Sequence, residues 1–204
     1  MEFKVRTILN DEDYLRQISK EVDFNDKSYL KEAQLLANYC RKEKLSLAFA
    51  AVQIGIPKRI IYIKKSSLDK AYDLDWDEKK VLINPVIIKR VGMTKYWEAC
   101  ASCLDYMGLV SRPYEIEIEY YDIDGNKIKE KFSGFMATVL SHEFDHLNGI
   151  LHIDIAEDLK IMNPEERKEF RKTHDYEIIS KEGNYDELKV KNKQKRLKKW
   201  MNYY

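Results

Sequence analysis

The stretch FMATVLSHEFDHLNGILH, residues 135–152, predicts the central element of the fold. Residues 135–147 are mostly apolar, with Gly134 before them and Gly149 after them, where a helix commonly stops. A helix on the protein surface shows an apolar stripe on one side only. Because residues 135–147 are apolar on most sides, we expect a helix that is buried against β-sheet.

The same helix carries two histidines at a spacing that suits a metal site. His142 and His146 are four residues apart and therefore share one helix face. Glu143 lies one step round from His142, where its carboxylate reaches a water on the ion without binding the ion itself. Polar groups in an apolar helix need partners, and a metal ion supplies one. The pattern predicts a divalent metal site with Glu143 as general base.

The third protein ligand has two candidates, because a catalytic site of this kind takes three. His152 completes the longer pattern H-E-x-x-H-x-x-G-x-x-H, which is typical of the metzincin endopeptidases. However, ILHIDI (150–155) alternates as a strand does. The other candidate is a thiolate from WEACASCLDY (97–106), where Cys100 and Cys103 lie in a polar stretch. Their C-x-x-C spacing also fits a redox pair or half of a zinc site, but the chain has no second C-x-x-C.

Composition favours one compact domain. The chain has 204 residues, of which 44% are hydrophobic, and 36 Lys and Arg balance 35 Asp and Glu. This balance indicates neither a nucleic-acid partner nor a membrane partner. No apolar run approaches the ~20 residues of a membrane span, and the amino terminus is charged from its second residue, so we expect a cytoplasmic protein. Three cysteines do not suggest a disulfide framework, and Cys40 lies on the apolar stripe of a predicted helix.

The clearest local prediction is an antiparallel hairpin over 115–132. Acidic residues alternate with apolar ones on its first strand, and lysines do so on its second, with Asp124-Gly125 as the turn signal. The remaining predicted elements are a helix over about 28–43 capped by Asn25 or Asp26, a strand near 59–65, a surface loop over 66–80, a strand over 81–91 broken or edge-placed by Pro85, and a charged helix after Pro164.

Together these elements predict an α+β fold. We expect antiparallel β-sheets packed around the buried helix, followed by a C-terminal helical and basic extension. Residues 189–200 contain seven Lys or Arg. The predicted division is a catalytic domain over 1–180 and a basic tail over 181–204.

Three stretches in order resemble the peptide deformylases, over about residues 1–180. The signatures of that family are G-x-G-x-A-A-x-Q, E-G-C-x-S and H-E-x-D-H, and this chain has SLAFAAVQ (46–53), EACAS (98–102) and HEFDH (142–146). The resemblance implies removal of the formyl group from the N-terminal formyl-methionine of new polypeptides. It also selects Cys100 as the third metal ligand, since Glu98 and Ser102 flank it in register, and leaves Cys103 as a nearby free thiol.

The resemblance implies further roles. The donors to the oxyanion are Gln53 and the backbone N–H of Ala101, and Glu98, Arg112 and Asp145 lie behind the metal ligands. The methionine pocket is formed by Leu47, Ala48, Phe135, Thr138 and Val139. The ion is one divalent metal, with Fe²⁺ favoured natively and Zn²⁺, Ni²⁺ or Co²⁺ able to substitute. Expected partners are formyl-methionyl nascent peptides and, through the basic tail, the ribosome. We expect a monomer that binds neither DNA nor membrane.

The chain departs from the family pattern at its glycines. Ser46 and Ala48 replace both glycines of the first signature, and Ala99 replaces that of the second. A methyl group at residue 48 is expected to crowd an extended peptide or to push the loop outward. An alternative function is therefore a divergent deformylase-like protein with an altered substrate or a role in binding only.

Overall fold

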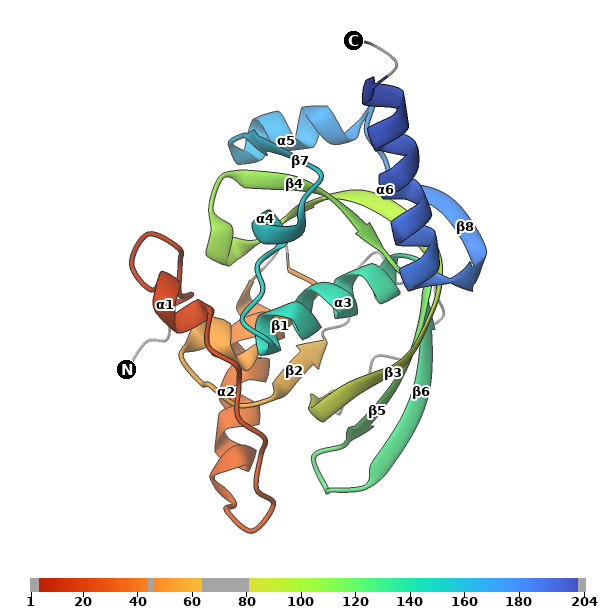
Figure 1. Ribbon diagram of the computed structural model, residues 1–204. Coiled ribbons are helices and arrows are strands. Elements are labelled where there is room, and N and C mark those ends of the chain that lie inside the picture. Colours follow the sequence, from red (N-terminus) through yellow and green to blue (C-terminus); the bar gives the residue numbers. More distant parts are fainter. Residues whose placement is uncertain (1–3, 44–45, 64–80, 202–204) are drawn as a thin grey trace.

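The computed structural model describes residues 4–43, 46–63 and 81–201. Within these residues, eight antiparallel strands form one curved sheet, and helices cover both of its faces (Figure 1). The strands are β1 (Ala48–Ala50), β2 (Ile60–Ile63), β3 (Val81–Ala99), β4 (Tyr106–Arg112), β5 (Glu115–Tyr121), β6 (Lys127–Ser133), β7 (Asp158–Ile161) and β8 (Glu177–Asn184). The helices are α1 (Glu12–Leu15), α2 (Ser28–Lys42), α3 (Phe135–Leu147), α4 (His152–Ile155), α5 (Pro164–Arg171) and α6 (Tyr185–Met201), with 3₁₀ turns η1 (Ala51–Ile54) and η3 (Ala101–Cys103). The predicted α+β class is confirmed.

The long strand β3 organises the sheet. Its first half pairs with β2 and β5, and its second half pairs with β4 and β8. The prediction that Pro85 breaks this strand is wrong, because Pro85 lies at a shift of register between Ile83 and Val86, where a strand tolerates proline. The alternative, an edge position, holds locally, since β3 pairs with β5 alone between Ile83 and Val91. Gly92 joins the two halves with φ +68, and a Cβ there would lie 2.5 Å from the Ser180 carbonyl oxygen.

The predicted buried helix is α3, which runs through the concave side of the sheet (Figure 1). Strand alternation decides which residues face it: Ala48 and Ala50 of β1 join the core around α3, whereas Phe49 joins a second core under α2. Strands β1 and β2 are therefore covered on both faces.

The predicted hairpin is β5–β6, with its acidic and basic residues paired. Glu119 contacts Lys127 at 2.6 Å and Glu117 contacts Lys129 at 3.3 Å. The register sets Glu119 opposite Lys129, so these ion pairs are diagonal. Its apolar face supplies Ile116 and Ile118 to the core around α3.

Two other local predictions need correction, on the cap of α2 and on His152, whereas the loop over 66–80 and the domain division stay predictions. Helix α2 begins after Lys27 without a side-chain cap, although Asp26 accepts the Ser28 N–H at 2.9 Å. His152 lies on the short helix α4, not on a strand. The predicted loop over 66–80 lies outside the described residues. The predicted division at residue 180 falls inside β8, which pairs with β3. Among the described residues, no helix combines the length and apolar character needed to span a bilayer.

Candidate active site

Two separate elements bring the three predicted metal ligands together. Cys100 directly follows β3, while His142 and His146 share one face of α3. One donor atom of each residue lies within 4.8 Å of the other two. The Cys100 Sγ and the His146 Nε2 are 3.3 Å apart, and the two imidazole rings meet edge to face. Two imidazoles and one thiolate form a donor set that suits a divalent transition metal.

Electrostatics around these ligands favour a positive ion. A hydrogen bond from the Cys103 thiol, together with the neighbouring imidazoles, holds the pKa of Cys100 well below its usual value despite burial. Although burial lowers the pKa of His142, the Cys100 thiolate and Glu98 raise it well above its usual value. Without a metal ion, a proton on His142 supplies positive charge beside the Cys100 thiolate. A bound metal ion can replace that proton and supply the positive charge instead.

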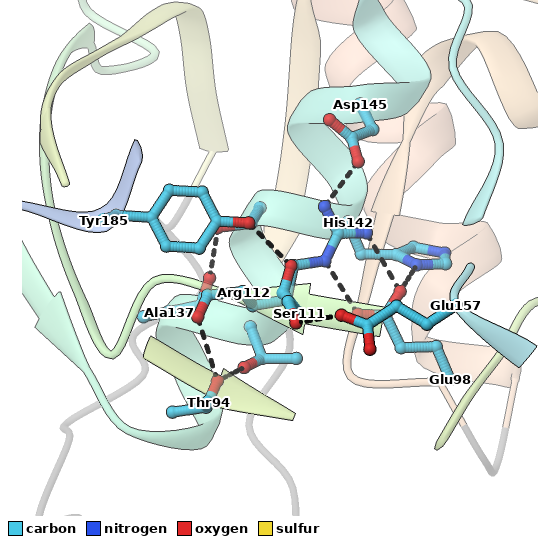
Figure 2. Close-up of polar contacts among 11 residues, drawn as sticks. Thr94, Glu98, Ser111, Arg112, Ala137, His142, Asp145, Glu157 and Tyr185 are labelled. Atoms are coloured by element: carbon cyan, nitrogen blue, oxygen red, sulfur yellow. Dashed lines mark hydrogen bonds and ion pairs between the residues drawn. The ribbon is translucent and has the colours of Figure 1, made fainter. Parts of the chain in front are cut away.

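A buried network behind His142 fixes its orientation (Figure 2). The Glu98 carboxylate lies 2.8 Å from His142 Nδ1, which leaves Nε2 for an ion. Arg112 donates to both oxygens of Glu98, at 2.7 and 2.9 Å, and also contacts Asp145. Burial raises the pKa of Glu98, but the Arg112 guanidinium outweighs it and holds the pKa far below its usual value. Glu98 is therefore an anion that orients the imidazole.

Glu143 and Gln53 meet at the backbone of Ala50. The Ala50 N–H donates to Glu143 Oε2 at 2.8 Å and to Gln53 Oε1 at 3.0 Å. Burial raises the pKa of Glu143, whose exposure is 5%. Gln53 Nε2 lies 3.2 Å from Ser102 Oγ and 3.5 Å from Cys100 Sγ. The Glu143 carboxylate and the Gln53 amide therefore flank the three metal ligands. Ala101, which is exposed, is the first residue of η3 and directly follows Cys100.

The predicted pocket residues differ in accessibility. Leu47, Phe135 and Val139 are half-buried, and Val139 packs against the same core as Ala48. Phe135 lies edge-on to Tyr96 and Tyr176, with ring centroids 5.1 and 5.6 Å away. Thr138 is 2% exposed, and its hydroxyl is 3.4 Å from that of Thr94. The Thr138 side chain thus contacts β3 and offers little surface to a ligand.

The long histidine pattern does not form one metal site. His152 lies on α4, and its ring is 5.7 Å from that of His142. Its donor atom groups instead with Cys100 and Cys103. Burial lowers the pKa of His152 to about 4.

Some residues of the network carry no local signal in the sequence. Tyr185 of α6 donates to the Ser111 carbonyl oxygen at 2.7 Å, next to Arg112 (Figure 2). Glu157 accepts from Ser111 Oγ at 2.6 Å and from Lys95 Nζ at 2.7 Å. Each contact joins residues far apart in the chain, so spacing within a motif could not indicate it.

Comparison with known proteins identifies the family of this chain. The sequence model of a family described as "Polypeptide deformylase" matches residues 5–162. The chain belongs to the polypeptide deformylase family. A peptide deformylase of Pelagibacter ubique (strain HTCC1062) is 39% identical over 160 residues, which are 76% of this chain and 88% of that protein.

Solved deformylase structures share the fold. A class I type b peptide deformylase from Acinetobacter baumannii, solved with Met-Ala-Ser bound, matches with a TM-score of 0.65 and 28% identity, over 76% of this chain and 98% of that one. A peptide deformylase from Synechococcus elongatus in complex with actinonin matches with a TM-score of 0.64 and 28% identity, over 84% and 85% of the two chains. The predicted family and enzyme class are confirmed: the chain is a deformylase, and this family is metal-dependent.

Proposed function

We propose that this deformylase hydrolyses the formyl amide of N-terminal formyl-methionine on new polypeptides, with Cys100, His142 and His146 as ligands of one divalent ion. The observation that carries the proposal is the meeting of these three donor groups with Glu143 and Gln53 in one buried cluster. A divalent ion there supplies Lewis-acid chemistry and lowers the pKa of a water. We propose Fe²⁺ as the native ion, with Zn²⁺, Ni²⁺ or Co²⁺ as substitutes, since this donor set suits all of them.

Glu143 is the proposed general base. It takes a proton from the attacking water and returns it to the leaving amine. Two features of this carboxylate support the role: burial raises its pKa, and the Ala50 N–H holds one of its oxygens at 2.8 Å. A base with a raised pKa is suited to both transfers near neutral pH.

Gln53 and the backbone N–H of Ala101 are the proposed donors to the oxyanion that develops on the formyl oxygen. The Gln53 amide has two N–H donors, and its nitrogen lies near both Ser102 Oγ and Cys100 Sγ. Because Ala50 fixes the amide oxygen at 3.0 Å, the nitrogen is directed at the metal ligands before substrate binds.

The methionine side chain is proposed to bind between Leu47 and Ala48 on one side and Phe135 and Val139 on the other. Thr138 is proposed to support this second wall from behind, since its side chain is buried against β3. Strand β1 ends the sheet order and pairs only with β2 among the described strands, so a peptide can add along its other edge. The Ala48 methyl lies in the core around α3 and is 5% exposed. It therefore lies outside the plane in which a peptide would pair, which supports retained activity despite the missing glycine.

The basic helix α6 is the proposed ribosome contact. Lys189, Lys191 and Lys193 are exposed on it. Exposed lysines on one segment suit a polyphosphate surface, since each can displace a counterion. We propose that the enzyme acts as a monomer in the cytoplasm, where new polypeptides emerge from the ribosome.

The first test is formyl release from formyl-Met-Ala-Ser by protein purified without oxygen. We expect turnover in the native chain and a loss of about 10²–10⁴-fold in Glu143→Gln, with the metal content unchanged, because only proton transfer is removed. Glu169→Gln, which changes an exposed carboxylate on α5, is the matched control and should retain full turnover.

Two outcomes would contradict the proposal. Full turnover in Glu143→Gln would remove Glu143 from the reaction. No turnover in the native chain with one ion bound would favour an altered substrate or a role in binding only.

A further inference from the structure

A second group of metal-binding side chains lies directly beside the proposed metal centre. It consists of Cys100, Cys103 and His152, and one donor atom of each lies within 4.8 Å of the other two. We propose that these residues bind a second, thiophilic divalent ion such as Zn²⁺, with the Cys100 thiolate shared between the two ions. The inference goes beyond the proposed function and shares only Cys100 with it.

His152 provides the first independent support. Its side chain is 1% exposed, and neither ring nitrogen has a hydrogen-bond partner. Buried polar atoms almost always have a partner, and an exception calls for an ion or a water. Imidazole beside two thiols is a donor set typical of protein zinc sites. An ion held by His152 and the two cysteines would engage one of the unpaired nitrogens.

The surrounding fold holds His152 against the cysteines. Asp154 accepts the Leu151 N–H at 2.8 Å and a bond from Arg16 at 2.9 Å, which fixes helix α4. Gly108 on β4 makes room for the ring, because a Cβ there would lie 3.1 Å from His152 Cδ2 and 2.9 Å from the Ala156 Cβ. The imidazole therefore occupies a site that a larger residue at position 108 would close.

The three donors lie in a dry environment. Cys103 is fully buried and Cys100 is 6% exposed. Leu15 and Leu151 pack against them, and Ile8 and Ile153 complete the apolar surround. Because no carboxylate belongs to this donor group, the ion that it suits is one with a preference for sulfur and imidazole over oxygen. That preference excludes Ca²⁺ and Mg²⁺, which take oxygen ligands.

The test counts bound metal. Full-length protein freed of metal, kept without oxygen and in a reductant that contains no thiol, is titrated with Zn²⁺ alone and passed through gel filtration. We expect about two zinc ions per chain in the native protein and about one in both Cys103→Ser and His152→Phe. Cys40→Ser, which changes a buried thiol on α2, is the matched control and should retain two.

Cobalt provides a spectroscopic check of the same site. The second equivalent of Co²⁺ should add thiolate-to-cobalt charge-transfer absorbance in the native protein and in Cys40→Ser, and should not do so in Cys103→Ser. His142→Ala should lose the ion of the proposed catalytic centre and keep the one bound by Cys103 and His152. This variant separates failure of the proposed function from failure of the inference.

Two results would overturn the second site. One is a native protein that binds a single zinc ion in excess Zn²⁺. The other is a second zinc ion that persists in both Cys103→Ser and His152→Phe. Since these two variants alter different elements, and the cobalt titration uses the native chain, a folding defect in one variant leaves the inference testable.

Discussion

At the scale of single residues, Arg112 is the buried cation that pairs with the carboxylates behind the metal ligands. It is 4% exposed and contacts two carboxylates, those of Glu98 and Asp145. A buried charge that loses its partner keeps the cost of its desolvation without the compensating attraction. Arg112 therefore stabilises the fold as well as the orientation of His142.

We expect Arg112→Met to lower the free energy of unfolding of the metal-free protein by about 3–5 kcal/mol, because it leaves Asp145 without its cation and the buried Glu98 with His142 as its remaining partner. Urea unfolding at neutral pH measures this. Lys129→Met, which breaks the exposed pair with Glu117, is the control and should change the free energy little. Equal effects of the two substitutions would contradict the buried network.

Residues within motifs were predictable, and residues that meet through the tertiary fold were not. His142, Glu143 and His146 follow from the helical repeat alone. Tyr185 contacts a carbonyl 74 residues earlier in the chain, and nothing near Tyr185 indicates it. His152 completes a known ligand pattern, yet the turn after Leu147 directs it to the cysteines instead.

At the scale of elements, helix α6 contacts β4 through a hydrogen bond from Tyr185. Its hydroxyl donates to the Ser111 carbonyl oxygen, and burial raises the pKa of this hydroxyl from 10.0 to about 12. A raised pKa in the folded state means that the stabilisation is complete below the unfolded pKa of 10 and is lost as the pH rises to 12.

We expect the native protein to lose about 2–3 kcal/mol more unfolding free energy than Tyr185→Phe between about pH 9 and pH 12. The reason is that only the native chain has the phenol of Tyr185 to deprotonate, whereas the other buried tyrosines, such as Tyr120, are present in both proteins and cancel in the difference. Denaturant unfolding at a series of pH values gives the difference, in which the titration of lysines cancels. Parallel curves for the two proteins would show that Tyr185 does not titrate with folding.

Element types were more predictable than their partners. Helix α3 and the β5–β6 hairpin matched because their apolar periodicity is strong and local. Strand β3 is longer than predicted, because Pro85 suggested a break in the strand. The structure instead accommodates this proline at a shift of register, and the strand continues. Alternation around His152 suggested a strand, but only six residues carried the pattern, too few to separate a strand from a single helical turn.

At the scale of the whole molecule, positive charge is distributed unevenly on a nearly neutral chain. The lysines of β6 face glutamates on β5. Lys189, Lys191 and Lys193 lie on α6, where the acidic residues are Asp186 and Glu187 in the first turn of the helix. The two sets thus carry the same charge in different surroundings.

We expect changing the three lysines of α6 to Gln to weaken ribosome binding and to reduce the slope of log affinity against log salt by about 3, roughly one for each lost phosphate contact. Sedimentation with ribosomes over a salt series measures both quantities.

The matched control removes the same number of charges from the hairpin, at Lys127, Lys129 and Lys131. It should leave the slope unchanged. An equal loss in both triple variants would indicate attraction by net charge alone and would contradict docking through α6.

The long strand β3 has a consequence for the synthesis of the enzyme itself. Met93 pairs with Ser180, so this edge of β3 remains open until translation has reached Ser180, 87 positions later in the chain. An open strand edge is a template for unwanted pairing. An enzyme that trims the beginnings of other polypeptides therefore completes its own sheet only when its last strand has left the ribosome.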